Sequence, residues 1–249
     1  MLVIDVDPQA NATSGLGVDP GWLSRSMYDV FMGGIDGTRE ITLRDVIRET
    51  RSGIDLAPSN LNLVGAEPFF YQTPDRSHIL KWVINNLHGY QFILIDTPPS
   101  MGQFVINGLV ASDRTVVTFD RGIFALTGLH TLMAIFDDIR EYTGETIHAE
   151  MAIVTRTGQE GSPSPRAGFV EGLKRLLGME TRGGEPQADQ LVFEVEEEMR
   201  KYFKTVYNVP YSHQIAAAQR RGLPISHYDP ECDAAKVYEQ IALEVMAWE

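Results

Sequence analysis

Short apolar or β-branched runs alternate along the chain with segments in which apolar residues recur every three or four positions. Unbroken runs of this kind, without polar alternation, are typical of parallel strands that are covered on both faces. The pattern therefore predicts strands at five places. They are residues 2–4, 92–95, 115–118, 152–154 and 205–207.

Two longer segments have helical spacing. From Leu126 onward, apolar residues at positions 129, 133, 136 and 139 fall on one helix face. Within residues 234–248, Val237, Ile241 and Val245 form a second stripe. Strands that alternate with helices in this way predict an α/β fold with a doubly wound, mainly parallel sheet flanked by helices. We assign all of residues 1–249 to a single domain of this class.

Stretches rich in glycine, proline and aspartate interrupt the pattern and predict loops. Residues 16–40 form the first, with Asp19-Pro20-Gly21 as a turn. Residues 158–165 and 182–189 form two more, on either side of a short helical piece at 169–177.

Composition narrows the class of protein. A hydrophobic content of 43% with 22% charged residues is ordinary for a globular chain and excludes disorder as the default. The net charge of −13 excludes a generally basic, DNA-coating surface and leaves a local basic patch open. The single cysteine, Cys232, rules out an intrachain disulfide. No apolar run approaches the ~18 residues that a membrane span needs, and the first residues lack a signal-peptide pattern, so we expect a cytoplasmic protein.

Aspartates follow two of the expected strands. Asp5 and Asp7 come after residues 2–4, and Asp96 comes directly after residues 92–95. A hydrophobic strand that ends in aspartate holds Mg²⁺ in many nucleoside triphosphatases, often through a water molecule. A single aspartate in such a place is also common as a helix N-cap or turn residue. The two motifs together, each followed by a proline-containing turn, predict a shared magnesium–nucleotide site.

The segment around the first pair carries a family resemblance. Residues 4–17, Ile-Asp-Val-Asp-Pro-Gln-Ala-Asn-Ala-Thr-Ser-Gly-Leu-Gly, closely resemble switch I of the ParA/Soj partition ATPases, which are relatives of MinD. Residues 96–100, Asp-Thr-Pro-Pro-Ser, resemble the Walker B and switch II segment. Further resemblances follow in the family's order at residues 55–67, 125–129 and 222–238, so the likeness spans nearly the whole chain.

The resemblance implies roles for matching residues. Asp7 would position the attacking water and sense the γ-phosphate, and Asp5 would support the Mg²⁺ environment. Asp96 would hold Mg²⁺ through water. Thr155 and Pro210 fall where the family surrounds the adenine. The implied cofactors are ATP and Mg²⁺, and the implied partners are a second copy in an ATP-dependent homodimer and a ParB-like protein that stimulates hydrolysis. The output would be segregation of a plasmid or chromosome, or positioning of another cargo.

One family element is absent from the sequence. The family carries a Lys-Gly-Gly-Val-Gly-Lys-Thr-Thr loop upstream of the switch I strand, whereas no Gly-Lys-Ser or Gly-Lys-Thr occurs here. That loop cradles the β- and γ-phosphates and ligates Mg²⁺, so we expect no ATP hydrolysis by these 249 residues alone. Two interpretations stay open. Either the true start lies upstream, or the protein is a degenerate, non-catalytic pseudo-ATPase that acts as an interaction module.

Three further departures concern partners. DNA-binding family members carry arginines shortly after the proline that matches Pro210, where this chain has Tyr211 and Gln214. Arg220 and Arg221 lie further on and either contact DNA phosphates without sequence specificity or are simply solvated. The terminal helix lacks the lysine and arginine cluster of MinD-like membrane helices, which predicts no membrane binding. Residues 158–198 are longer than the family segment and read as an insertion, either a tolerated excursion or a site for a partner.

Overall fold

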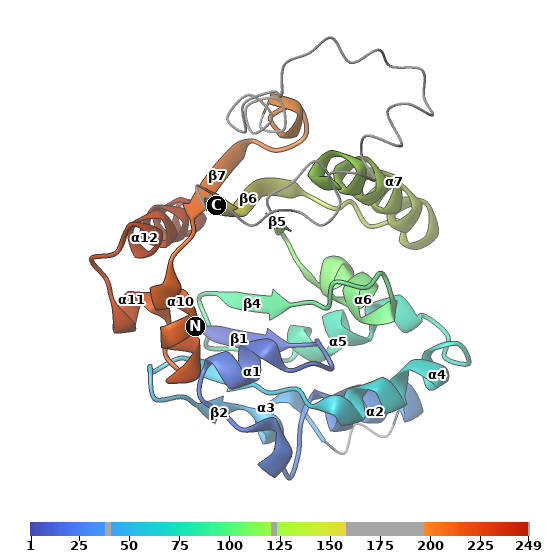
Figure 1. Ribbon diagram of the computed structural model, residues 1–249. Coiled ribbons are helices and arrows are strands. Elements are labelled where there is room, and N and C mark those ends of the chain that lie inside the picture. The colour runs from blue at the N-terminus through green and yellow to red at the C-terminus, as the bar shows by residue number, and fades with distance from the viewer. Residues whose placement is uncertain (38–40, 121–123, 158–196, 249) are drawn as a thin grey trace, which may run out of the picture.

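The computed structural model describes residues 1–37, 41–120, 124–157 and 197–248, and its helices and strands alternate as the sequence predicts (Figure 1). The first part of the chain contains β1 (Leu2–Asp5), α1 (Asn11–Gly15), η1 (Pro20–Trp22), α2 (Met27–Asp36), α3 (Leu43–Val46), β2 (Arg48–Glu49), β3 (Asp55–Ala57), η2 (Leu61–Ala66), α4 (Glu67–Phe70), η3 (Arg76–His78), α5 (Ile79–Asn85), β4 (Ile93–Asp96) and α6 (Gln103–Ala111). The second part contains β5 (Thr115–Asp120), α7 (Phe124–Thr143), β6 (Ala149–Thr157), β7 (Thr205–Pro210), α10 (His213–Arg220), α11 (Ile225–Tyr228) and α12 (Asp233–Met246).

The strands form two sheets. The first has the order β2-β3-β1-β4, in which β1 pairs in parallel with both β3 and β4 and only the short β2 is antiparallel. The second has the order β5-β6-β7 and is parallel throughout. All five expected strands are present, and the α/β class with mainly parallel sheets is confirmed. The predicted insertion at 158–198 lies outside the described residues, except for its last two.

Two strands differ from the expectation that both faces are covered. Leu94 of β4 is 46% exposed and Val116 of β5 is 36% exposed. Among the described residues, β4 pairs only with β1, and β5 pairs only with β6, so each strand is the edge of its sheet. Apolar side chains on these two strands are open because no neighbouring strand helps to cover them. An edge strand also leaves one row of backbone N–H and C=O groups without a sheet partner.

Helices around the first sheet form its core. Three phenylalanines from α2, α4 and α6, Phe31, Phe70 and Phe104, meet edge-to-face with ring centroids 5.3–5.6 Å apart. All three are buried together with the β1 side chains Leu2 and Ile4. Edge-to-face contact is a favoured geometry for aromatic rings, so this cluster fixes how the three helices lie against β1.

The loop predicted at residues 16–40 is wrong for its second half, because Met27–Asp36 is helix α2. Ser26 caps this helix, accepting from the Tyr28 amide at 3.2 Å, while Asp29 accepts in return from the Ser26 amide at 2.8 Å. Apolar residues at helical spacing then bury the inner face. The capping box and the buried stripe outweigh the helix-weakening glycines in this segment.

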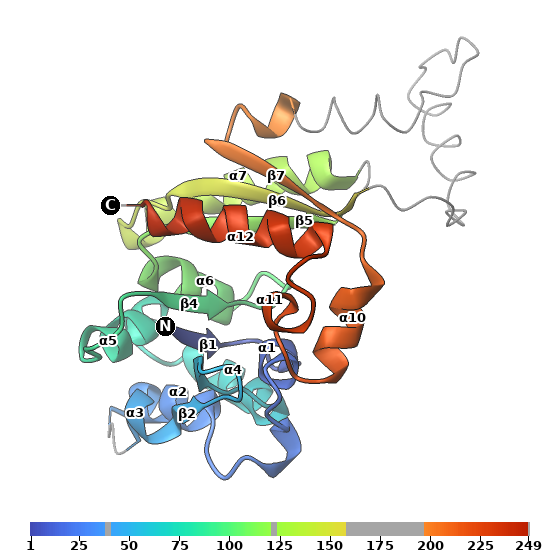
Figure 2. The same ribbon diagram turned by 90° about the vertical axis from the view of Figure 1, so that its left-hand side faces the viewer.

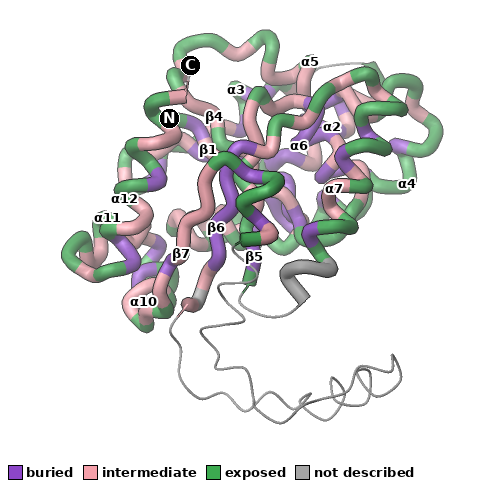
Figure 3. Tube along the Cα trace, turned by 90° about the horizontal axis from the view of Figure 1, so that it is seen from above, coloured by how far each residue is buried: buried purple, intermediate pink, exposed green. Residues whose placement is uncertain are grey.

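Helices α7 and α12 pack against the second sheet with the predicted faces. Leu129, Phe136 and Ile139 of α7 are buried, and Ile241 of α12 is buried against Val209 and Met151. Buried positions concentrate in the middle strands β1 and β6, whereas much of α10 and α11 is exposed or half-buried (Figure 3). None of the described helices is long and apolar enough to cross a membrane.

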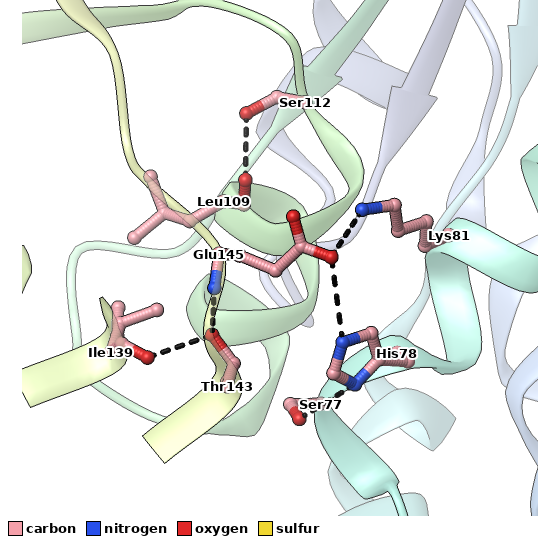
Figure 4. Close-up of polar contacts among 8 residues, drawn as sticks. All are labelled: Ser77, His78, Lys81, Leu109, Ser112, Ile139, Thr143 and Glu145. Atoms are coloured by element: carbon pink, nitrogen blue, oxygen red, sulfur yellow. Dashed lines mark hydrogen bonds and ion pairs between the residues drawn. The ribbon is translucent and has the colours of Figure 1, made fainter. Parts of the chain in front are cut away.

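A polar cluster joins the helices of the first sheet to the connection between α7 and β6 (Figure 4). Lys81 of α5 donates to Glu145 at 2.5 Å, and His78 Nε2 lies 3.7 Å from the same Glu145 oxygen. These two neighbours, Lys81 above all, hold the pKa of Glu145 below its ordinary value. The Glu145 amide in turn donates to the hydroxyl of Thr143, which caps the end of α7. Because the cluster is partly exposed, its ion pairs add little to stability. Its main effect is to fix how α5 lies relative to the connection between α7 and β6.

Candidate functional site

The parallel register of β1 and β4 brings two of the three candidate aspartates side by side. Asp5 pairs with Asp96 in the last position of both strands, and the Val6 amide donates to the Asp96 carbonyl at 2.9 Å. The chain then turns away through Asp7. Because parallel strands end at the same edge of a sheet, this edge gathers three carboxylates from two distant sequence motifs.

Asp5 is fully buried and organises the loop that follows it. Its Oδ1 accepts from the Asp7 amide at 3.0 Å, and its Oδ2 accepts from the amide and the hydroxyl of Thr13 at 2.8 and 2.7 Å. The Thr13 hydroxyl also accepts from the Ser59 amide at 3.0 Å, which ties the loop to the end of β3. Burial raises the pKa of Asp5, and the bonds from Thr13 oppose that rise. Both Asp5 oxygens are used inside the chain, so this residue acts through the shape of the loop.

Sequence reasoning missed Thr13 and Ser59. Thr13 lies within the segment that resembles switch I, and its place eight residues after Asp5 gives no periodic signal. The loop also contains Ala10 in a left-handed conformation, with φ 55° and ψ 40°. A side chain makes that conformation costly by about 1 kcal/mol, so the surrounding hydrogen bonds hold the loop in a strained shape.

Asp7 and Asp96 are the carboxylates that remain for a ligand. Asp7 is 5% exposed, and its Oδ1 accepts from the Gln9 amide at 2.9 Å. Asp96 is exposed, and yet its surroundings raise its pKa to about 6, first because neighbouring groups displace water from the carboxyl group and then through the charges of Asp5 and Asp7. Three negative charges this close together favour a bound cation.

The three aspartates do not make a metal site by themselves. In the described part of the chain, no group of three or more histidine, cysteine, aspartate or glutamate side chains is arranged to hold a metal ion. Carboxylate oxygens suit Mg²⁺, which keeps several waters and often binds through one or two carboxylates plus phosphate oxygens. The donor set therefore fits a magnesium ion that arrives with a phosphate ligand.

Thr155 and Pro210 lie together at the carboxyl ends of β6 and β7. The Thr155 hydroxyl donates to the Phe119 carbonyl of β5 at 3.2 Å, and Pro210 pairs with Thr157. The Tyr211 amide then donates to the Thr157 carbonyl at 2.9 Å and extends the pairing by one residue. Thr155 and Pro210 therefore lie at the carboxyl edge of the second sheet, whereas the three aspartates lie at the carboxyl edge of the first.

Arg220 and Arg221 lie at the end of α10, and both are exposed. The Arg221 guanidinium stacks over the Tyr228 ring of α11, with its carbon 5.1 Å from the ring centroid. Helix α10 packs against α1, and Figure 2 shows α10 and α11 on the same side of the molecule as α1. The two arginines thus lie at the end of a helix that packs against α1, and α1 is the element that follows the Asp7 loop.

Comparisons with known proteins agree with these observations. A family model described as an AAA domain matches residues 1–149. The chain is 30% identical over 252 residues to the sporulation initiation inhibitor protein Soj of Bacillus subtilis, with 99% of this chain and 86% of that protein covered. It is 29% identical over 256 residues to the chromosome partitioning protein ParA of Caulobacter vibrioides, with 100% and 83% covered. The chain belongs to the ParA/Soj family of partition ATPases.

Solved structures show that this ParA/Soj family member has the expected fold. Apo McdA from Cyanothece superimposes with a TM-score of 0.75 at 18% identity, over 98% of this chain and 86% of that one. Cobyrinic acid a,c-diamide synthase from Mycobacterium smegmatis, with a bound ATP analogue and magnesium, gives a TM-score of 0.63 at 23% identity, over 88% and 78% of the two chains. At these identities the likeness concerns the fold alone. Use of nucleotide and magnesium is therefore a property of the family and its structural neighbours.

Proposed function

We propose that this protein is an ATP-dependent switch in the cytoplasm that segregates a plasmid or chromosome or positions another large cargo. The observation that carries this proposal is the pairing of Asp5 with Asp96 at the carboxyl edge of β1 and β4, with Asp7 in the loop just beyond. Asp7 would position the attacking water, and Asp96 would hold Mg²⁺ through water. Asp5 holds the Asp7 loop in shape through its bonds to the Asp7 amide and to Thr13.

Magnesium, when bound with ATP, neutralises the phosphate charge and lowers the cost of having three carboxylates together. Thr155 and Pro210 would contact the adenine from the second sheet, mainly through backbone and shape. Phosphoryl transfer depends almost wholly on positioning and charge neutralisation, so the site needs a phosphate cradle in addition to these residues.

We propose that the cradle is carried by a further parallel strand that pairs between β4 and β5. The two strands are open sheet edges in the described part of the chain, and their apolar residues Leu94 and Val116 are substantially exposed. A parallel strand there would cover both side chains, satisfy both rows of backbone groups and join the two sheets into one. These 249 residues contain no Gly-Lys-Ser or Gly-Lys-Thr.

The experiment is an ATPase assay on the product of the complete open reading frame, with and without duplex DNA and a ParB-like partner. Asp7→Ala is expected to reduce turnover by about 10²-fold, the usual effect of losing a group that handles the attacking water. A matched control is Asp113→Ala, at an exposed position just before the amino end of β5. Normal turnover in Asp7→Ala would remove Asp7 from this role.

A second candidate function rests on the sequence itself. Without a Gly-Lys-Ser or Gly-Lys-Thr loop, the protein would be a non-catalytic interaction module built on the same fold. Titration calorimetry with MgATP separates the two candidates. If the complete product binds no nucleotide, the interaction module is correct. Nucleotide binding followed by dimerisation in sedimentation experiments supports the switch.

We also assign the partners. A second copy of this chain would form the ATP-dependent homodimer, and a ParB-like protein would stimulate hydrolysis. Arg220 and Arg221 would contact duplex DNA through its phosphates, without sequence specificity. Loss of DNA affinity in the double variant Arg220→Ala/Arg221→Ala, with a lower salt dependence of binding, tests this assignment.

A further inference from the structure

Helix α6 approaches the turn that follows Asp96 more closely than a side chain would allow. Gly108 lies within α6 and is buried. A Cβ placed on Gly108 would lie 2.6 Å from Cγ2 of Thr97 and 3.5 Å from Cγ2 of Ile95. The second distance is an ordinary contact between carbon atoms, whereas the first is far too short. Thr97 and α6 therefore fit together only because residue 108 has no side chain.

The glycine at position 108 has no explanation in the backbone of α6. Glycine inside a helix is less favourable than alanine, because it loses more conformational freedom when the chain folds. Gly108 is not a cap, since α6 runs from Gln103 to Ala111. Its φ is not positive either, so no left-handed conformation requires a glycine. The close packing of α6 against Thr97 is the feature of the structure that accounts for it.

Helix α6 itself is held in place by the side chain of Asn107, which is fully buried. Its Oδ1 accepts from the Leu80 amide of α5 at 3.0 Å, and its Nδ2 donates to the Arg76 carbonyl of η3 at 2.8 Å. Breaking buried hydrogen bonds of this kind leaves polar groups without partners and is costly. A larger side chain at position 108 is therefore accommodated by a movement of Thr97, and α6 keeps its place.

Thr97 is the side of this contact that can move. It is half-buried and lies in a turn, residues 97–100, that belongs to no helix or strand. It also follows Asp96 directly, at the end of β4, which is an edge strand in the described part of the chain. A displacement of Thr97 therefore changes the direction of the Asp96 carboxylate.

We propose that Gly108 is a positioning residue of the magnesium site. Its missing side chain lets Thr97 pack against α6, and this packing fixes the direction of the Asp96 carboxylate. The inference rests on the proposed function, in which Asp96 holds the ion. It adds a residue that touches neither ion nor nucleotide and acts through one methyl group. Residues that orient a metal ligand in this way affect metal affinity by about 10- to 100-fold.

The test measures Mn²⁺ binding to the product of the complete open reading frame in the presence of ADP. Mn²⁺ prefers the same carboxylate ligands as Mg²⁺, and its free form is counted by electron paramagnetic resonance. Gly108→Ala is expected to weaken Mn²⁺ binding by about tenfold. The affinity for ADP in EDTA is expected to change by less than about twofold, because the substitution is distant from the adenine end of the site. A general loss of structure would lower both affinities.

The compensating change is Thr97→Ser, which removes Cγ2 and keeps the hydroxyl. The double variant Gly108→Ala/Thr97→Ser lacks the clash, and its Mn²⁺ affinity is expected to return to within about threefold of the natural value. The matched control is Gly128→Ala in helix α7, where a Cβ meets nothing within 4 Å. This control makes the same change to a helical glycine and is expected to leave Mn²⁺ affinity unchanged.

Two results would overturn the proposal. One is a natural Mn²⁺ affinity in folded Gly108→Ala. The other is a double variant that does not fold, or that binds Mn²⁺ as weakly as the single variant, because the alanine would then act elsewhere than at the Thr97 methyl group. Thermal melting shows which variants are folded. The double variant keeps the test valid if Gly108→Ala does not fold.

A second measurement needs neither nucleotide nor metal. The Val6 amide donates to the Asp96 carbonyl, and the Leu80 amide donates to Asn107 of α6. In Gly108→Ala, hydrogen exchange of the Val6 amide is expected to become at least about fivefold faster, while the Leu80 amide stays protected. Unchanged exchange at Val6, or equal acceleration at both amides, would contradict the proposal. If the complete natural protein binds neither ADP nor Mn²⁺, the proposed function fails, and this measurement still decides whether Gly108 positions the turn.

Discussion

Replacing Asp96 by asparagine is expected to stabilise the folded protein at neutral pH, although Asp96 is a candidate ligand of the magnesium ion. The folded-state pKa of Asp96 is raised from the ordinary value of 3.8 to about 6, because the carboxyl group is partly withdrawn from water and is close to the charges of Asp5 and Asp7. For an acid with a raised pKa, the stabilising contribution is fully present below pH 3.8 and is lost as the pH rises through about 6. At pH 7 the charged carboxylate therefore destabilises the fold.

A shift of about two pKa units corresponds to about 3 kcal/mol at most. The outer side of Asp96 is exposed, and solvent screens much of that interaction, so we expect a gain of about 1 kcal/mol for Asp96→Asn at pH 7. Below about pH 3 the aspartate is mostly neutral in both states, and the gain should vanish. The site thus holds a negative charge that costs stability, which suits a position that binds a cation.

Urea denaturation followed by tryptophan fluorescence measures this gain, at pH 7 and again at about pH 3. The control is Asp113→Asn, an exposed position between α6 and β5 that changes the net charge by the same amount. A gain in Asp96→Asn that is equal at both pH values, or no gain at pH 7, would show that the neighbouring carboxylates do not act on Asp96 as described.

One further prediction concerns Thr13, which shapes the site, and another concerns Glu150, which lies at the opposite end of the second sheet. Thr13→Val removes a buried hydroxyl that bonds the Asp5 carboxylate and the Ser59 amide. Urea denaturation is expected to show a free energy of unfolding lower by about 1–3 kcal/mol. Thr13→Ser, which keeps the hydroxyl, is expected to recover most of this loss. Equal losses in both variants would contradict a role for the hydroxyl. Glu150 forms ion pairs with Lys204, at 2.6 Å, and with Arg114, and both keep the pKa of Glu150 below its ordinary value. The stability that Glu150 contributes to the fold is therefore present above pH 4.5 and is lost as the pH falls through the folded-state pKa. Glu150→Gln should therefore cost about 1 kcal/mol at pH 7 and flatten the acid side of the stability curve, whereas an unchanged acid limb would refute the assignment.

Local pattern was enough for the main elements. The five expected strands form, and α7 and α12 bury the predicted faces, because a strand or helix face is written into the period of its apolar residues. Helix α2 was missed because its signal is the capping by Ser26 and Asp29, within a glycine-rich segment. Local sequence pattern also could not predict that β4 and β5 are exposed edge strands in the described part of the chain, since exposure depends on which strand lies beside them.

The sequence by itself determined that Asp5 and Asp96 end strands, that Asp7 follows the first of these strands, and that their motifs follow the order of one family. Only the tertiary structure decided that Asp5 faces inward to Thr13 while Asp7 and Asp96 remain for a ligand, because that division depends on the register of β1 against β4 and on a loop that closes over eight residues. The close backbone approach of Gly17 and Gly222, which lie far apart in the sequence, likewise exists only after α1 and α10 pack together. Periodicity encodes the faces of single elements, whereas contacts between distant backbones arise from how those elements fit in three dimensions.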